Sequence, residues 1–230
     1  MMFGIHWDLS SNWAFAVSII PILLRGMVVT IEATLLGFLV ALLLGMIFAL
    51  LRAVPLKIVS WPVAFIVEFV RDTPLLVQLY FLYFVLPNYG IVLPSFMTGA
   101  IALGVQYSAY TSEVYRAGLE AVPRGQWEAS LALNMPIWLV YRDVVVPQAV
   151  PRVIPALGNY LVSMLKDTPI LSAVTVLEML NLATIIGDRT FRYLVPLSMV
   201  GGLFLVLTLF SSWLVRVLER RMPNDGIPLR

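Results

Sequence analysis

Cysteine is absent from the 230 residues, and histidine occurs once, at His6. Disulfides, thiolate metal sites, iron–sulfur clusters and cysteine nucleophiles are therefore excluded, and one imidazole cannot supply a histidine metal cluster or a proton relay. Charged residues are also scarce, at 12% of the chain against about 25% in an ordinary soluble domain. Hydrophobic residues make up 60%. This composition indicates a membrane protein, and a formal net charge of +2 gives no support for nucleic-acid binding.

Apolar runs long enough to cross a bilayer occur repeatedly along the chain, and a transmembrane helix needs about 20 such residues. Five runs approach or exceed this length: 33–51, 58–86, 91–112, 144–165 and 193–215. A further stretch, 168–187, is interrupted by Glu178 and Asn181 and predicts a sixth span, a re-entrant segment or a helix on the outer surface. We therefore expect an all-α, polytopic membrane protein with about five transmembrane helices, in which residues 1–230 form one domain.

The basic residues predict the orientation, because Lys and Arg collect on the cytoplasmic side of a membrane. With five spans and an external N-terminus, ten of the fifteen basic residues fall inside: Arg52, Lys57, Arg116, Arg124, Arg142, Arg152, Arg216, Arg220, Arg221 and Arg230. A sixth span would send the arginine-rich C-terminus outside. We therefore expect residues 1–18 to form a short external segment and the C-terminus to be cytoplasmic.

The longest polar stretch, Glu113 to Arg142, lies on the side predicted to be inner. Its periodicity predicts a short helix that begins near Pro123, with Trp127 and Trp138 as aromatic anchors. By composition alone, this helix fits equally well as an amphipathic element on lipid headgroups and as a docking element for another protein.

Within this stretch, three patterns follow one another at fixed distances: Glu128-Ala129-Ser130, then Asn134, then Val144-x-Val146-Pro147. Their order and spacing resemble the EAA loop of bacterial ABC importer permeases, with Ser130 in place of the second alanine and Asn134 in place of the glycine. Asn is the residue that best replaces glycine where the backbone is left-handed. The second replacement therefore preserves the turn that the motif requires.

Two further patterns resemble the polar amino-acid subfamily of these permeases. They are residues 68–78, and residues 146–149 followed by Lys-Asp-Thr-Pro at 166–169. The stretches 154–169 and 191–194 are similar to permeases of ectoine and hydroxyectoine importers. Together the motifs cover most of the chain and imply a type I importer permease fold with a cytoplasmic coupling helix, in the bacterial inner membrane.

The resemblance also implies partners: two ATP-binding subunits, a second permease that is identical or paralogous, and a periplasmic or lipid-anchored solute-binding protein. ATP and magnesium would be used by the ATP-binding subunits, since this chain has no glycine-rich phosphate loop. We expect this chain to bind no cofactor or metal and to have no catalytic residue. The loop at about 120–147 would couple to the ATPase through Gly125, Glu128, Ala129, Ser130, Ala132, Asn134 and Pro147.

Charged residues inside apolar runs are costly unless they are paired or hydrated, so they are candidates for function. The expected substrate path comprises Glu68, Arg71, Asp72, Thr73, Lys166, Asp167 and Thr168. Asp-Thr-Pro occurs twice in this region, and each proline frees a backbone carbonyl beside a carboxylate. The two cations would bind the carboxylate of a zwitterion and the two aspartates its ammonium group. A cluster of ions that only fixes helix packing is an equal alternative.

Two other groups of charges have simpler expected roles. Glu113 and Arg116 should pair across one helical turn at the entrance to the coupling loop. Glu32 should take part in helix packing or gating.

An ion-coupled secondary amino-acid carrier is the main alternative, since intramembrane carboxylates would then bind sodium ions or protons; a docking loop argues against it. An intramembrane enzyme is disfavoured because no serine–lysine, paired-aspartate or metal constellation is discernible. The sequence therefore predicts an ATP-driven importer permease that moves a polar amino acid or similar zwitterion, ectoine included, by alternating access.

Overall fold

The computed structural model describes residues 7–221, and every regular element in this range is helical. The α-helices are α1 (Asn12–Ala53), α2 (Lys57–Asp72), α3 (Leu75–Tyr80), α4 (Ser95–Glu120), α5 (Arg124–Ala132), α6 (Ile137–Leu139), α7 (Val146–Asp167), α8 (Met179–Thr190) and α9 (Leu194–Arg220). Between them lie the π-helices η1 (Phe81–Val85) and η3 (Val140–Val145) and the 3₁₀-helices η2 (Leu86–Tyr89) and η4 (Thr168–Val174). The all-α prediction is confirmed.

The helices divide into two compact units. Unit 1 comprises Met1–Leu39, Thr73–Gly104 and Ser163–Phe210, and unit 2 comprises Val40–Asp72, Val105–Val162 and Ser211–Arg230. The long helices α1, α4, α7 and α9 each contribute residues to both units. Unit 2 contains the predicted coupling loop, whereas the predicted substrate residues are divided between the units.

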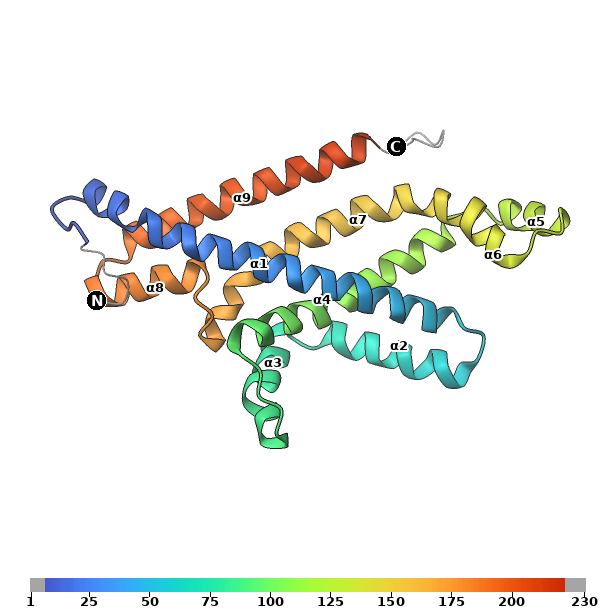
Figure 1. The fold of residues 1–230 in the computed structure, drawn as a ribbon, viewed down its shortest axis with the longest axis horizontal. Helices are drawn as coiled ribbons and strands as arrows, with labels where there is room; N and C mark the ends of the chain where they lie inside the picture. Colours follow the sequence, from blue (N-terminus) through green and yellow to red (C-terminus); the bar gives the residue numbers. More distant parts are fainter. Residues whose placement is uncertain (1–6, 222–230) are drawn as a thin grey trace. The chain divides into compact units, whose positions relative to one another are not determined.

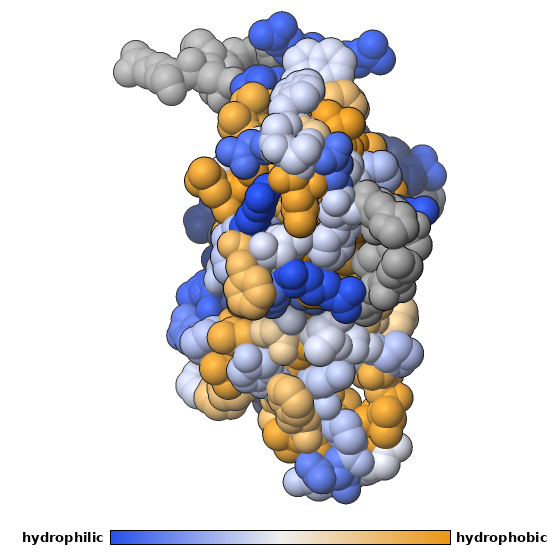
Figure 2. All heavy atoms as spheres, turned by 90° about the vertical axis from the view of Figure 1, so that its left-hand side faces the viewer, coloured by the Kyte–Doolittle hydropathy of each residue, from blue (hydrophilic) through white to orange (hydrophobic). Residues whose placement is uncertain are grey.

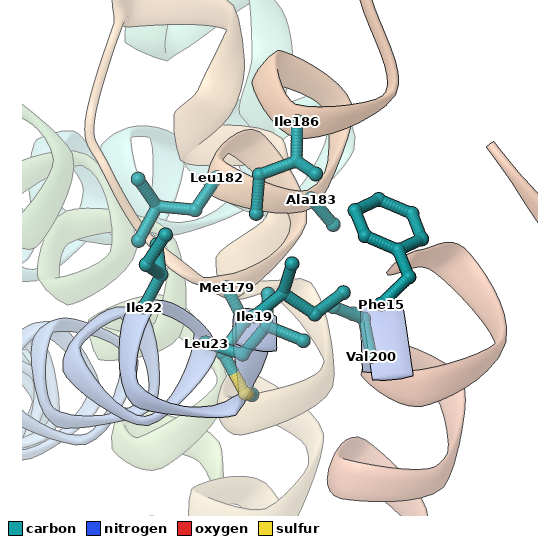
Figure 3. Packing of buried hydrophobic residues seen from close by; sticks show 9 residues of the cluster. All are labelled: Phe15, Ile19, Ile22, Leu23, Met179, Leu182, Ala183, Ile186 and Val200. Carbon is teal, nitrogen blue, oxygen red and sulfur yellow. The ribbon is translucent and has the colours of Figure 1, made fainter. Parts of the chain in front are cut away.

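The core of unit 1 forms where α8 lies along the first half of α1 (Figure 1). Figure 3 shows side chains from α1, α8 and α9 pointing toward one another: Phe15, Ile19, Ile22, Leu23, Met179, Leu182, Ala183, Ile186 and Val200. The helices approach closely because position 26 of α1 is glycine. A Cβ added there would lie 2.9 Å from the Met179 Cα atom.

The first span is longer than expected. The run 33–51 lies within α1, which already begins at Asn12. Residues 12–18, predicted to belong to a short external segment, are therefore part of α1. Their location outside the membrane stays a prediction, and residues 1–6 lie outside the described residues. Helix α1 contains Ser18, Pro21 and Arg25 before the run 33–51, and a helix tolerates such residues when its other faces are apolar.

The predicted span 58–86 and the stretch 168–187, for which three alternatives were open, both correspond to broken helices. The run 58–86 is divided into α2 and α3, with Thr73 and Pro74 between them, because proline disfavours helical backbone in the residue before it. The stretch 168–187 contains η4 and α8 in place of one straight helix. At 12 residues, α8 spans only about 18 Å. A straight sixth span is therefore excluded, and the re-entrant and surface alternatives are left.

By length and apolar composition, α1 and α9 could each cross a membrane. Two broken pairs, α2 with 75–89 and 137–174 with α8, meet the same criterion when both halves are counted, which gives at most four candidates within residues 7–221. The remaining predicted span, 91–112, coincides with α4, which has 26 residues. This helix carries five buried polar residues: Thr98, Gln106, Ser108, Thr111 and Ser112. Much apolar surface is exposed elsewhere, as the orange atoms of Figure 2 show, which suits contact with lipid.

Candidate coupling and substrate sites

The predicted coupling helix is present as α5, at the end of unit 2 that also holds α6 (Figure 1). Pro123 occupies the N-cap position of α5, as expected. The N–H groups at the start of a helix have no carbonyl partner within the helix, so a proline, which has no N–H, is well tolerated there. The Gln126 N–H donates to the Pro123 carbonyl at 2.9 Å. Gly125 is exposed in the first turn, and a Cβ added there would meet nothing within 4 Å.

Asn134 ends the coupling helix in the conformation predicted for it. Its φ is 53°, in the left-handed region. The Asn134 N–H donates to the Leu131 carbonyl at 2.9 Å, and the Met135 N–H donates to the Ser130 carbonyl at 3.2 Å. These two bonds form a Schellman motif, which satisfies carbonyls that a helix end leaves without partners. The expectation that Asn replaces Gly here for its backbone is confirmed.

A small hydrophobic cluster holds the coupling helix against its neighbours. Val122, Val140, Val145 and Ala149 are buried in it, with Leu119, Trp127 and Met135 packed around them. The Trp127 ring meets the Tyr141 ring edge-on at 5.2 Å between centroids. The cluster joins the end of α4 and the start of α7 to α5, so these segments form one packed element.

The two tryptophans differ in their environment. Trp127 anchors α5 as predicted, but Trp138 is 58% exposed, so it does not serve as a packed anchor within unit 2. The Arg142 guanidinium lies 5.0 Å from the centre of the Trp138 ring. Hydrogen bonds donated to the Asp143 carboxylate, and the attraction between the two charges, raise the pKa of Arg142. Arg142 therefore carries its charge at any physiological pH.

The predicted coupling residues fall on two sides of α5. Ser130 is buried, and its hydroxyl donates to the Gln126 carbonyl at 2.7 Å. The residues exposed around the helix include Gly125, Glu128, Ala129, Ala132 and Asn134, joined by the apolar Leu131 and Leu133. The exposed side thus combines a carboxylate, small residues and large apolar side chains. Such a surface is suited to close approach by another protein.

Pro147 lies in the first turn of α7, which continues directly from η3. Because proline lacks an N–H, Pro147 donates no backbone hydrogen bond to the preceding helical turn, which belongs to η3. The π-helix η3 widens the backbone immediately before Pro147. Irregular helical turns of this kind occur frequently at functional sites.

The first group of predicted substrate residues lies on the last turns of α2, in unit 2. The Arg71 Nη2 atom lies 2.5 Å from the Glu68 Oε2 atom, and Arg71 Nε lies 4.0 Å from Asp72 Oδ1. The carboxylate of Asp72 is mostly exposed. Glu68 therefore orients the Arg71 guanidinium, and Asp72 presents its charge outward from unit 2.

The second group lies in unit 1. Thr73 accepts a hydrogen bond at its hydroxyl from the Gln78 amide at 2.8 Å. Lys166 and Asp167 are exposed at the end of α7, whereas Thr168 is buried and donates to the Leu165 carbonyl at 2.7 Å. In the first group, therefore, the exposed carboxylate of Asp72 ends α2, and in the second group the exposed Lys166 and Asp167 precede the buried Thr168.

The structure also shows an ion cluster that sequence spacing did not reveal in full. Arg116 binds Glu113 at 2.8 Å, which confirms the predicted pair, and it also binds Glu120 at 2.6 Å. Glu113 additionally pairs with Arg52, which lies 61 residues earlier in the chain. No local signal could indicate this contact, because it joins α1 to α4.

Two acidic residues of unit 1, one buried and one exposed, lie outside the two predicted substrate groups. Glu178 is fully buried and accepts hydrogen bonds from the Leu180 and Asn181 N–H groups, so its carboxylate caps α8. The polar residue that interrupted the apolar run is thus the start of a helix. Glu32 is exposed on α1, so packing within unit 1 does not explain it.

Comparison with known proteins places the chain in a family. Residues 41–224 match the model of the binding-protein-dependent transport system inner membrane component. The chain is 58% identical to the probable amino-acid ABC transporter permease protein y4tG of Sinorhizobium fredii, over all of both chains. It is 30% identical to the arginine transport system permease protein ArtQ of Bacillus subtilis, over 90% of this chain and 94% of that one.

Solved structures agree with this result. The crystal structure of an amino acid ABC transporter with histidines has a TM-score of 0.87 and 34% identity, and the match covers 93% of this chain and all of that one. An inward-facing structure of the MetNI methionine ABC transporter shares the fold, with a TM-score of 0.73 at 20% identity over 90% of this chain and 98% of that one. The chain therefore belongs to the family of inner membrane components of binding-protein-dependent transport systems, and it is an ABC transporter permease subunit rather than an ion-coupled carrier.

Proposed function

We propose that this chain is the membrane-spanning subunit of an importer for a polar amino acid or a similar zwitterion, and that separate subunits hydrolyse the ATP. The relatives for which a substrate is named include glutamine and arginine permeases, which favours an amino acid. Ectoine, suggested by sequence similarity alone, is the second candidate. The exposed side of α5, closed by the Schellman turn at Asn134, is the observation that carries the coupling role.

The full transporter would contain two ATP-binding subunits, a second permease and an external solute-binding protein. The N-terminus would lie outside and the arginine-rich C-terminus inside, so that α5 faces the cytoplasm. On this arrangement α5 inserts its exposed side into an ATP-binding subunit. Glu128 would meet a basic or amide group there, while Ala129 and Ala132 allow the backbones to approach.

Reversing the charge at position 128 tests this coupling role. We expect Glu128→Arg to lower the amount of ATP-binding subunit that co-purifies with the permease about tenfold, the effect of roughly 1.4 kcal/mol of lost binding. The matched control is Glu219→Arg, which makes the same change near the end of α9, outside the loop at 120–147. Equal co-purification for the wild type and Glu128→Arg would contradict the docking role of α5.

The substrate path is proposed to include both charged groups. Arg71 is held by Glu68 and would bind the substrate carboxylate, together with Lys166. Asp72 and Asp167 would bind the ammonium group, since charge-assisted hydrogen bonds are the strongest that side chains offer. Thr73 and Thr168 stand beside the two breaks, where backbone carbonyls become available for a polar ligand.

Uptake measurements distinguish this role from simple helix packing. Arg71→Ala and Lys166→Ala should each raise the substrate concentration for half-maximal uptake about tenfold, because a hydrogen bond to a charged group is lost. Glu68→Gln keeps the guanidinium but removes its ion pair, so it should have a smaller effect than Arg71→Ala. If Glu68→Gln and Arg71→Ala impair uptake equally, the ion pair matters only for helix packing, and Arg71 does not bind the substrate. Competition by glutamine, arginine and ectoine in the same assay identifies the solute.

A further inference from the structure

The ion cluster at the end of α4 has a part that helix stability does not explain. Arg116 bridges Glu113 and Glu120, all three on α4, and such pairs stabilise a single helix. Arg52 belongs to the last turn of α1, so its contact with Glu113 connects two helices. The side chains of Arg52 and Glu113 are only 17% and 22% exposed, whereas that of Glu120 is 62% exposed.

The same two helices are also in close contact about two to three turns before Arg52 along α1. A Cβ on Gly45 of α1 would overlap the Thr111 hydroxyl and lie 2.9 Å from the Ser108 carbonyl oxygen. The Thr111 hydroxyl donates to the Ala41 carbonyl at 2.8 Å. The Arg52–Glu113 pair therefore closes an interface that is already tightly packed, and it fixes the register of α1 against α4.

The end of α4 also packs against α7 and against the coupling helix α5. Gly118 of α4 packs so closely on Val153 of α7 that a Cβ would overlap that side chain. The Arg152 guanidinium donates to the Ala121 carbonyl, just beyond the end of α4. Leu119 and Val122 pack in the cluster that holds Trp127 of α5. A displacement of α5 must therefore move the end of α4.

From these contacts we infer that Arg52 and Glu113 are a positioning pair, which makes α1 follow α4 when the ATP-binding subunits move the coupling helix. The inference rests on the docking role proposed for α5. A half-buried ion pair between two helices suits this task, because it resists sliding that apolar contacts alone would permit. When Arg52 is replaced, Arg116 still partners Glu113, so the ion pairs within α4 are retained and only the ionic contact with α1 is lost.

The test uses the assembled transporter with its ATP-binding subunits and solute-binding protein in lipid vesicles, and it measures solute imported per ATP hydrolysed. Arg52→Gln and Glu113→Gln should each lower this ratio about threefold or more, and the double variant should add little, as expected for two residues that act as one pair. Arg52→Lys keeps the charge and should recover part of the ratio. Glu120→Gln breaks only the exposed contact within α4 and should leave the ratio unchanged.

The outcomes separate this inference from the docking proposal. If the ATP-binding subunits co-purify with every variant but the ratio in Arg52→Gln and Glu113→Gln equals that of the wild type, the positioning role is wrong and the docking proposal stands. Uptake and ATP hydrolysis that fall together at constant ratio would likewise overturn it, since that pattern reports only less folded protein. Should Glu113→Gln fail to fold, Arg52→Gln and Arg52→Lys give the same comparison. If Glu128→Arg leaves co-purification unchanged, the docking proposal itself fails.

Discussion

Replacing Gly26 by alanine is expected to destabilise unit 1 by about 1–3 kcal/mol, the usual cost of adding atoms to a filled interior. The added methyl group would lie 2.8 Å from Leu182 Cδ1, 2.9 Å from Met179 Cα and 3.0 Å from Met179 N. The leucine side chain can rotate away, but the backbone at Met179 cannot. Helices α1 and α8 must therefore separate, which disturbs the cluster that contains Phe15, Ile19 and Ile186.

The separation would also weaken a polar contact, since the Met179 N–H donates to the Thr30 hydroxyl at 3.4 Å. The measurement is the melting temperature of the purified protein in detergent, which should fall by about 2–4 °C for each kcal/mol lost. Gly202→Ala is the matched control, because a Cβ at this position of α9 meets nothing within 4 Å. Alanine favours helix over glycine by about 1 kcal/mol, so this variant should be at least as stable as the wild type. A similar melting temperature for Gly26→Ala and Gly202→Ala would refute the packing argument.

Replacing Asn134 by valine should disrupt the coupling loop and sharply reduce transport. The φ of 53° is accessible to asparagine, but left-handed backbone costs other L-residues about 1–2 kcal/mol, and a β-branched side chain is among the least tolerated there. The Schellman bonds of Asn134 and Met135 would be lost, and α5 would be free to extend or fray. Its exposed side would then no longer be presented in one orientation.

Asn134→Gly serves as the control, since glycine adopts the left-handed conformation without cost. We expect Asn134→Gly to transport like the wild type, and Asn134→Val to lose both uptake and co-purification of the ATP-binding subunit by about tenfold. If both substitutions impair the transporter to the same degree, the asparagine side chain is required for a contact, and the backbone explanation is wrong.

Features that depend on neighbouring residues could be predicted from the sequence. Pro123 and the periodicity of residues 113–142 predicted a short helix, and Asn134 in place of the motif glycine predicted a left-handed turn. Both are found as expected. Local conformation is decided within a few residues by proline, by glycine-like backbone and by capping groups. The scarcity of charge likewise identified a membrane protein, because burial in lipid imposes the same requirement on every turn of a spanning helix.

Helix boundaries were predicted less well where a polar residue had two possible explanations. Glu178 interrupts an apolar run, and only the structure shows that its buried carboxylate caps α8. Similarly, the predicted first span was 33–51, whereas α1 begins at Asn12 and contains Pro21 and Arg25. Hydropathy averages over all faces of a helix, so it cannot separate a polar residue that ends a helix from one that the helix carries on an exposed side.

The sequence by itself determined the class of protein, the coupling motif and the backbone conformation of that motif. Only the tertiary structure decided which helices meet: α8 with α1 through Gly26, and α1 with α4 through the pair of Arg52 and Glu113. The physical reason is that such contacts join residues far apart in the chain, 61 positions for this ion pair. Their partners are chosen by the packing of whole helices, and no pattern within one helix records that choice.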